Sequence, residues 1–347
     1  MPTTRGYAAM SASAPLTPWE FERREVGEND ISIAIEFAGI CHSDIHQARE
    51  EWGKAKFPMV PGHEIVGRVT EIGSKVSNFK VGDLAGVGCY VDSCGSCEYC
   101  LVGESHWCLE SPIWTYNGTE YDGITPTHGG YSQSIVVKAN YALHVPENLD
   151  RAGVAPLLCA GITTYSPLRH WQAGPGKKVA VMGLGGLGHM AVKLAVAMGA
   201  EVTVLSHSEN KRADALAMGA AHFVDTSNKS SLRELKNNFD LIINTISADL
   251  DLSAYLETLR MHGSLVVVGI PEKPYEISPN NLLGRQRSLA GSSIGSIKET
   301  QEMLDFCSAH NITSDVEVIS ASYINEAYKR VVSSDVKYRF VIDATTF

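Results

Sequence analysis

Residues 177–206 read KKVAVMGLGGLGHMAVKLAVAMGAEVTVLS, and this alternation of apolar runs and glycines decides the fold of the second half of the chain. We expect a buried strand over 179–182, a helix that ends near Met198 and a second strand that ends near Ser206. A glycine-rich turn joins the first strand to the helix. This order of strand, glycine turn and helix is the one that a dinucleotide site requires.

The glycines of this turn have separate roles. In the spacing Gly183-x-Gly185-x-x-Gly188, the first permits a tight turn, the second lets the main chain approach a pyrophosphate, and the third lets helix and strand pack closely. Free N–H groups at the start of the helix face the anion. A glycine motif alone is a weak signal, but here a strand pattern precedes it and a helix and a second strand follow it. The expected dinucleotide-binding turn is Gly183, Leu184, Gly185, Gly186, Leu187 and Gly188.

Further strand and helix patterns follow this unit. Residues 239–244 (FDLIIN) and 264–269 (SLVVVG) are short apolar runs typical of buried strands, and 252–260 is a helical stretch between them. We therefore predict a six-stranded, doubly wound parallel sheet, which is a Rossmann fold of the α/β class.

The end of the second strand indicates which dinucleotide binds. Folds of this kind that bind NAD usually place a carboxylate there, which holds the ribose hydroxyls and repels a 2'-phosphate. Residues 206–208 instead read Ser-His-Ser, and two cations follow. Glu209 is nearby, and the same residues would also suit a solvated helix start. The pattern favours NADP(H), with the phosphate bound by Ser206, His207, Ser208, Lys211 and Arg212.

Four of the eight cysteines, Cys94, Cys97, Cys100 and Cys108, lie in one short segment. They would form either two disulfides or one tetrahedral metal site. The N-terminal residues lack the pattern of a signal peptide, and no apolar run reaches the ~20 residues of a membrane span. We therefore expect a cytoplasmic protein, where clustered thiolates favour zinc over disulfides. The prediction is one structural Zn2+ on these four cysteines.

Charge argues against nucleic acid as a partner of this cysteine segment. Residues 91–110 contain four carboxylates and no Lys or Arg, and the chain has a net charge of −10. Such a surface repels phosphates. With 347 residues, 44% of them hydrophobic and 20% charged, the chain is typical of a two-domain globular enzyme.

The first half of the chain offers ligands for a second metal. AGICHSDIHQ over 38–47 and VPGHEIVGRV over 60–69 contain Cys41 and His63. A catalytic zinc needs about three protein ligands and one open position, and two cysteines with one histidine are a known set. Cys159, just before the dinucleotide half, is the expected third ligand, which would place the metal at the cleft between domains. Taken singly, each is more often a buried structural residue.

These motifs in this order resemble the zinc-dependent medium-chain alcohol dehydrogenases. The resemblance rests on Gly62-His63-Glu64, the four-cysteine segment, Cys159 and GLGGLG, and it extends over about 6–343. The runs CHSDIH, PLLCAGITTYSPL and GSSIGS resemble the branch that is similar to cinnamyl alcohol dehydrogenase and prefers NADPH, which includes bacterial broad-range aldehyde reductases.

The resemblance implies a discontinuous domain plan. Residues 1–156 and 293–347 would form a GroES-like, mostly-β catalytic domain, and 157–292 would form the inserted Rossmann NADP-binding domain. Members of the family commonly pair through edge strands of the dinucleotide sheet, so SLVVVGI and RSLAGSS are candidate segments of a homodimer interface. The sequence leaves a tetramer open.

The resemblance also implies roles for site residues. Cys41, His63 and Cys159 would bind the catalytic zinc, with Glu64 as an occasional fourth ligand, and Asp44 would orient His63. Ser43 would bond to the substrate oxygen, and His46 would pass its proton to solvent. His42 would lie near the pyrophosphate, although a plain surface histidine is an open alternative, and Thr163 near the nicotinamide. The further cofactor-binding residues are Val268, Gly269, Ser292 and Ile294.

The implied reaction is hydride transfer between NADPH and an aldehyde whose carbonyl is polarised by zinc. The substrate pocket would be largely apolar and would suit aromatic or medium-length aliphatic aldehydes. Ser293 replaces a phenylalanine that plant lignin-forming enzymes often have, so we expect a wider pocket without dedicated cinnamyl specificity. Trp52 and Trp114 also suit ordinary core or rim positions. The candidate substrate residues are Gln47, Trp52, Cys89, Trp114, Ser293 and Ile294.

Two other functions are alternatives to a zinc-dependent alcohol dehydrogenase. A zinc-free, NADPH-dependent quinone reductase of the same superfold would lack the ligands Cys41, His63 and Cys159. A redox-sensing NADP-binding protein, which uses its cysteines as a disulfide switch, would have no use for the CHSDIH segment. The sequence therefore favours the enzyme with two zinc ions per chain.

Overall fold

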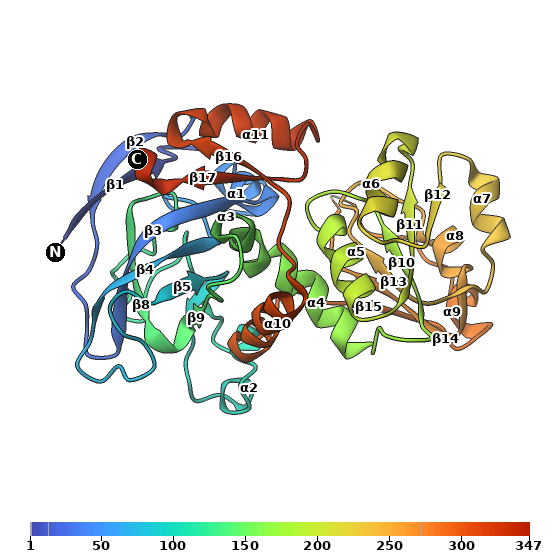
Figure 1. Cartoon of the computed structure of the whole chain (residues 1–347), viewed down its shortest axis with the longest axis horizontal. Coiled ribbons are helices and arrows are strands. Elements are labelled where there is room, and N and C mark those ends of the chain that lie inside the picture. Colours follow the sequence, from blue (N-terminus) through green and yellow to red (C-terminus); the bar gives the residue numbers. More distant parts are fainter. Residues whose placement is uncertain (1, 13, 272) are drawn as a thin grey trace. The chain divides into compact units, whose positions relative to one another are not determined.

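The chain folds into two compact units in the computed structural model, which describes residues 2–12, 14–271 and 273–347 (Figure 1). The discontinuous unit comprises Met1–Cys159 and Gly295–Phe347, and the inserted unit comprises Ala160–Ile294. The chain thus leaves the first unit once, completes the second and returns.

A six-stranded sheet with the order β12-β11-β10-β13-β14-β15 forms the centre of the inserted unit. All of its neighbouring strands pair in parallel, and the order reverses beside β10, so the sheet is doubly wound as predicted. The strands are β10 (Lys178–Met182), β11 (Glu201–Ser206), β12 (His222–Asp225), β13 (Phe239–Asn244), β14 (Leu259–Val267) and β15 (Ser288–Gly291).

Both faces of the central strand β10 are covered. Ala180 and Met182 belong to a core cluster with side chains of the short helices α7 and α8. Val179 and Val181, which point to the opposite face because strand side chains alternate, are also fully buried. The helices of this unit are α4 (Ala160–His170), α5 (Gly188–Ala197), α6 (Arg212–Ala217), α7 (Lys229–Glu234), α8 (Leu252–Leu256) and α9 (Asn280–Leu283).

The helix predicted over 252–260 is wrong at its C-terminal end. Helix α8 ends at Leu256, and strand β14 begins at Leu259. Leu259 is fully buried and pairs with Phe239 of β13, so sheet pairing and burial override the helical pattern of the sequence. The predicted strand also ends earlier than expected, at Val267, and the two residues that follow donate their N–H groups to the Asn244 carbonyl.

The discontinuous unit is built on a seven-stranded sheet with the order β16-β17-β3-β4-β5-β9, in which β8 also pairs with β3. Its strands are β3 (Asp30–Ile40), β4 (Ile65–Ile72), β5 (Leu84–Val87), β8 (Ser134–Lys138), β9 (Ala142–His144), β16 (Val316–Ser320) and β17 (Arg339–Asp343). Two small ribbons pair β1 (Thr3–Ala8) with β2 (Thr17–Glu22) and β6 (Tyr90–Asp92) with β7 (Ile113–Trp114). Strand β17 lies antiparallel to β3, so a strand near the C-terminus pairs with one near the N-terminus.

The α-helices of the discontinuous unit are α1 (His42–Ala48), α2 (Glu98–Leu101), α3 (Arg151–Val154), α10 (Ile297–His310) and α11 (Ile324–Val332). All except α10 and α11 are short. Helix α10 begins where the Ser296 hydroxyl accepts a hydrogen bond from the Glu299 N–H, and it ends at Asn311 in the left-handed conformation. Its buried face includes Cys307, which is fully buried.

The antiparallel pair β3 and β4 positions the chemistry of this unit. Strand β3 ends directly before Cys41, and β4 begins directly after Glu64. Ala38 pairs with Ile65, and the Gly39 N–H donates to the Glu64 carbonyl at 2.8 Å. Two segments that are distant in sequence therefore leave the sheet side by side. Across the described ranges, no helix is long and apolar enough to cross a membrane.

The core of the inserted unit supplies a stability test. Replacing Leu265, which is fully buried on β14, by alanine should lower the free energy of unfolding by about 2–5 kcal/mol, because the deletion leaves a cavity in the sheet. The matched control is Leu216→Ala on α6, where the side chain is 46% exposed and the change should stay within about 0.5 kcal/mol. Urea titration followed by circular dichroism measures both, and equal losses would contradict the prediction.

Candidate metal and dinucleotide sites

Four donor residues meet at the end of the β3–β4 pair. The donor atoms of Cys41, His63, Glu64 and Cys159 all lie within 4.8 Å of one another, and all four residues are buried. The sulfur atoms of Cys41 and Cys159 are 3.9 Å apart. Two sulfurs bound to one tetrahedral zinc at about 2.3 Å would be about 3.8 Å apart, whereas a disulfide needs about 2.05 Å. The thiol pair therefore fits a shared zinc ion.

Asp44 fixes the orientation of His63. Its buried carboxylate accepts a hydrogen bond from His63 Nδ1 at 3.0 Å, which leaves Nε2 as the nitrogen available to a metal. Burial lowers the pKa of His63, but Asp44 together with Cys89 and Cys41 more than offsets this, and the pKa lies well above its usual value. The same carboxylate accepts from the Cys41 N–H at 2.9 Å, where it caps helix α1.

Glu64 also directs an oxygen to the group. Its Oε1 accepts from Arg339 on β17, while its buried Oε2 has no hydrogen-bond partner among the residues that the structure describes. Burial raises the pKa of Glu64 to about 7, opposed by the Arg339 guanidinium. A Cβ at Gly39 would lie 2.0 Å from Oε2, so only glycine leaves room for this carboxylate. An unpartnered buried oxygen fits an occasional metal ligand.

Helix α1 carries the residues for which proton transfer was expected. Ser43 Oγ lies 3.5 Å from Cys41 Sγ, and His46 is one turn further along the helix. The His46 ring stacks on His42 at 4.9 Å and on Trp52 at 4.7 Å between ring centroids. Its Nδ1 bonds to Glu51, a residue that the sequence analysis did not identify.

The predicted substrate residues of the discontinuous unit are partly exposed. Gln47 accepts a hydrogen bond from Asn117 at 2.7 Å, and Trp52 and Trp114 are 43% and 44% exposed. The thiol of Cys89 lies 3.9 Å from the Leu158 carbonyl, next to Cys159 in the chain. The exposure of the two tryptophans agrees with a rim position and excludes the alternative of core aromatics.

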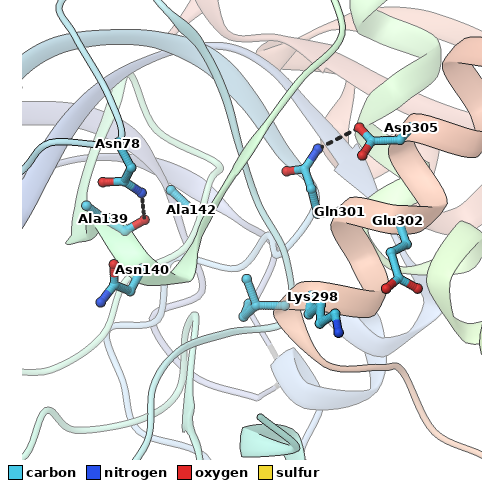
Figure 2. Close-up of a pocket in the computed structure, with 9 residues that line it drawn as sticks. Asn78, Ala139, Asn140, Ala142, Lys298, Gln301, Glu302 and Asp305 are labelled. Atoms are coloured by element: carbon cyan, nitrogen blue, oxygen red, sulfur yellow. Dashed lines mark hydrogen bonds between the residues drawn. The ribbon is translucent and has the colours of Figure 1, made fainter.

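A cavity of about 430 Å³ in the same unit lies beside α10, away from these residues (Figure 2). Asn78 bonds to the Ala139 carbonyl on one side of it, and Gln301 bonds to Asp305 on the other. None of the metal donors lines it.

The second metal group is the four-cysteine segment. The donor atoms of Cys94, Cys97, Cys100 and Cys108 lie within 4.8 Å of one another, and the sulfurs of Cys94 and Cys100 are 3.8 Å apart. All eight cysteines of the chain are free thiols. Hydrogen bonds from the backbone N–H groups of Ser96 and Cys97 lower the pKa of Cys94 to about 6, whereas desolvation raises the pKa of Cys100 to about 11. The geometry fits one tetrahedral zinc and excludes a disulfide in this state.

The glycine turn of the inserted unit has the expected local geometry. Gly183 has a φ of +85°, which favours glycine, and a Cβ on Gly188 would lie 2.1 Å from the Gly183 carbonyl oxygen. A Cβ on Gly185 would have no atom within 4 Å, so the main chain is open on that side. Helix α5 begins at Gly188. The turn therefore presents backbone N–H groups at an accessible helix start.

The residues expected to bind a 2'-phosphate differ in their surroundings. Lys211 is half-buried and donates to the Leu184 carbonyl at 2.9 Å, which connects it to the glycine turn. Arg212 instead pairs with Glu209 and packs over the ring of Phe223 at 4.7 Å. Glu209 is the carboxylate that the sequence placed beside the two cations. It forms an ion pair with one of them, Arg212.

The other predicted cofactor residues of this unit lie on several elements. Ser206 is buried at the end of β11, its hydroxyl accepts the Ser208 N–H, and His207 between them is exposed. Thr163 is buried on α4. The remaining predicted residues follow the ends of β14 and β15; they are Val268, Gly269, Ser292, Ser293 and Ile294.

Two family models match the chain. Residues 27–147 match the alcohol dehydrogenase GroES-like domain, and residues 186–309 match the zinc-binding dehydrogenase domain. The first match contains Cys41, His63 and the four-cysteine segment. The second begins within the glycine turn at Gly186.

The chain is similar to curated relatives over its whole length. It is 57% identical to an NADP-dependent alcohol dehydrogenase C of Mycolicibacterium smegmatis, with 100% of this chain and 99% of the relative covered. It is 51% identical to the aldehyde reductase YahK of Escherichia coli, with 99% and 98% covered.

The chain is also similar to solved structures of alcohol dehydrogenases. A cinnamyl alcohol dehydrogenase from Sorghum bicolor matches with a TM-score of 0.96 and 43% identity over 99% of this chain and 98% of that chain. A cinnamyl alcohol dehydrogenase from Helicobacter pylori, complexed with NADP(H), matches with a TM-score of 0.92 and 44% identity over the same shares. The resemblance drawn from the sequence motifs is confirmed, and with it the predicted GroES-like and Rossmann folds. This chain belongs to the zinc-binding alcohol dehydrogenase family.

Proposed function

We propose that this chain is an NADP(H)-dependent zinc enzyme that interconverts aldehydes and primary alcohols, and that it accepts a broad range of aromatic and aliphatic aldehydes. The observation that carries the proposal is the convergence of Cys41, His63 and Cys159 with Glu64 in one buried group. The names of the relatives add the coenzyme and the reaction class. Those names also include formaldehyde and mannitol dehydrogenases, which fits a family with varied substrates.

In this proposal Cys41, His63 and Cys159 would hold the catalytic zinc, and Glu64, whose Oε2 has no hydrogen-bond partner among the described residues, would be an occasional fourth ligand. Zinc when bound polarises the substrate carbonyl, and the nicotinamide supplies the hydride. Two thiolates reduce the net charge of the zinc site, and Asp44 holds the imidazole in the tautomer that leaves Nε2 free for the metal.

Proton transfer is assigned to helix α1. Ser43 beside Cys41 is the group that bonds to the substrate oxygen, because a hydroxyl both donates and accepts. His46 receives or supplies the proton, since a positioned imidazole can accept a proton and donate it again. Glu51, half-exposed and bonded to His46 Nδ1, stabilises the protonated ring and leads the proton toward solvent.

The discontinuous unit is the catalytic domain and the inserted unit the NADP-binding domain in this proposal, with the coenzyme phosphate groups at 183–188 and Lys211. A cytoplasmic location is proposed, because clustered cysteines that bind zinc rather than form disulfides are typical of a reducing compartment. Four cysteines hold a structural zinc that ties down a segment with little regular structure.

Zinc content tests both metal assignments. Wild-type protein should contain two zinc ions per chain by atomic emission. Cys159→Ser should keep one and lose benzaldehyde turnover with NADPH, because the thiolate ligand is gone, and Cys94→Ser should also keep one but lose thermal stability. Cys89→Ser is the matched control, because this thiol lies near Cys159 but outside both donor groups, and its zinc content should stay at two. A metal-free active wild type would contradict the proposal.

Coenzyme preference tests the phosphate site. We expect kcat/KM to be at least about tenfold higher for NADPH than for NADH, equivalent to about 1.4 kcal/mol. Lys211→Ala should remove most of this preference by lowering only the NADPH value, because the cation near the glycine turn is lost. Lys236→Ala, an exposed lysine of the same unit, should leave both values unchanged. Equal losses with both coenzymes would refute a phosphate contact.

A homodimer is the proposed assembly, formed through strand β15 at the edge of the inserted sheet. Support comes from the exposed apolar residues Ile270, at 60%, and Leu283, at 74%, in the segments next to β14 and β15. Sedimentation equilibrium should give twice the 37.5 kDa of one chain. Leu283→Asp should shift the protein toward monomer, whereas Leu216→Asp on α6, which packs on strand β12 at the opposite edge, should not. A monomeric wild type would exclude this interface.

A further inference from the structure

The segment 128–132 (His-Gly-Gly-Tyr-Ser) lies against residues 60–62, directly before His63. The proposed reaction assigns no role to this segment. Tyr131 is fully buried, and its hydroxyl donates to Asp44 Oδ2 at 3.2 Å. The other oxygen of Asp44 accepts from His63 Nδ1 and from the Gly62 N–H. The Tyr131 phenol and the His63 imidazole are therefore hydrogen-bonded to opposite oxygens of this carboxylate.

Backbone hydrogen bonds join this segment to residues 60–62, directly before His63. The donors are three successive N–H groups: Gly129 to the Val60 carbonyl at 2.7 Å, Gly130 to Gly62 at 2.9 Å, and Tyr131 to Pro61 at 3.0 Å. Consecutive main-chain hydrogen bonds thus hold the two segments together immediately beside a proposed metal ligand.

Glycines make this approach close. A Cβ on Gly129 would lie 2.3 Å from the Gly62 carbonyl oxygen, and a Cβ on Gly130 would lie 2.4 Å from Ile65 Cγ1. On the other side, Gly62 has a φ of +105°, and its Cβ would lie 2.6 Å from the Tyr131 ring. No larger residue fits at these positions without moving one segment away from the other.

Arg23 forms hydrogen bonds to three residues of the segment 128–132. This arginine follows β2, is 7% exposed and donates to the carbonyls of His128 and Gly129 and to the Ser132 hydroxyl. Burial lowers the pKa of Arg23 to about 9, so the guanidinium stays charged at neutral pH. A buried, charged donor that bonds to three residues of one segment fixes that segment firmly.

We infer that Tyr131 is a positioning residue for the catalytic zinc, and that Arg23 and the segment 128–132 hold its hydroxyl against Asp44. The inference rests on the proposed function, because it assumes that His63 binds zinc. A fully buried carboxylate keeps one orientation only while its oxygens are satisfied by donors. Loss of the phenol donor loosens Asp44 and, through it, the imidazole of His63.

Zinc release measures this effect directly. Tyr131→Phe removes only the hydroxyl, and the release of one of the two zinc ions to a chromogenic chelator should become about tenfold faster. Release of the zinc from the four-cysteine segment should keep its wild-type rate. Steady-state kinetics should show a lower kcat with an unchanged KM for NADPH, because the dinucleotide turn is untouched.

Tyr328→Phe is the matched control. Tyr328 packs against Tyr131 with ring centroids 6.4 Å apart, and among the described residues its buried hydroxyl makes no hydrogen bond to Asp44. Its removal should leave both release rates unchanged. Arg23→Lys, which keeps the charge but not the forked donors, should accelerate release of the same zinc as Tyr131→Phe.

The outcomes separate the inference from the proposed function. A wild type without a second zinc would contradict the proposed function itself. A wild type with two zinc ions whose release is unaffected by Tyr131→Phe, or affected equally by Tyr328→Phe, would overturn the positioning role. Faster release of both zinc ions would also overturn it, because it would indicate general destabilisation.

Discussion

The carboxylate of Asp44 is the constraint on which the candidate metal site depends. It is fully buried and accepts hydrogen bonds from the Cys41 N–H, the Gly62 N–H, His63 Nδ1 and the Tyr131 hydroxyl. These donors come from three segments of the chain. A buried carboxylate is stable only when its oxygens are satisfied, so the same contacts that solvate Asp44 also fix the spacing between Cys41 and His63.

The sheet makes that arrangement possible, because β3 and β4 leave it side by side directly at these residues. Strand β17, from the end of the chain, pairs with β3 and brings Arg339 to Glu64. The site thus combines residues from the beginning, middle and end of the sequence within one unit. The inserted unit contributes an open glycine turn directly before α5. Forming this turn requires only a strand followed by a helix.

The differences between the expected and the observed structure have identifiable physical causes. The stretch 252–260 has a helical pattern, yet Leu259 joins the sheet because burial beside Phe239 outweighs local propensity. Arg339, Tyr131 and Glu51 were not identified because their roles depend on contacts across the fold, and no local spacing marks a buried arginine or tyrosine as a partner of a distant carboxylate. Arg212, a predicted phosphate residue, pairs with the neighbouring Glu209, and the sequence had already marked that carboxylate as a competing feature.

The sequence by itself determined the parallel sheet, the glycine turn, the clustering of four cysteines and the family, because each depends on short-range order: strand, turn and helix in succession, or ligands a few residues apart. Most residues of the catalytic group were also named from their motifs. Only the tertiary structure decided what surrounds them: which oxygen of Glu64 lacks a partner, what Asp44 binds, and what holds Tyr131 in place. Those contacts join residues up to 275 positions apart, and only the pairing of distant strands and segments brings such residues together.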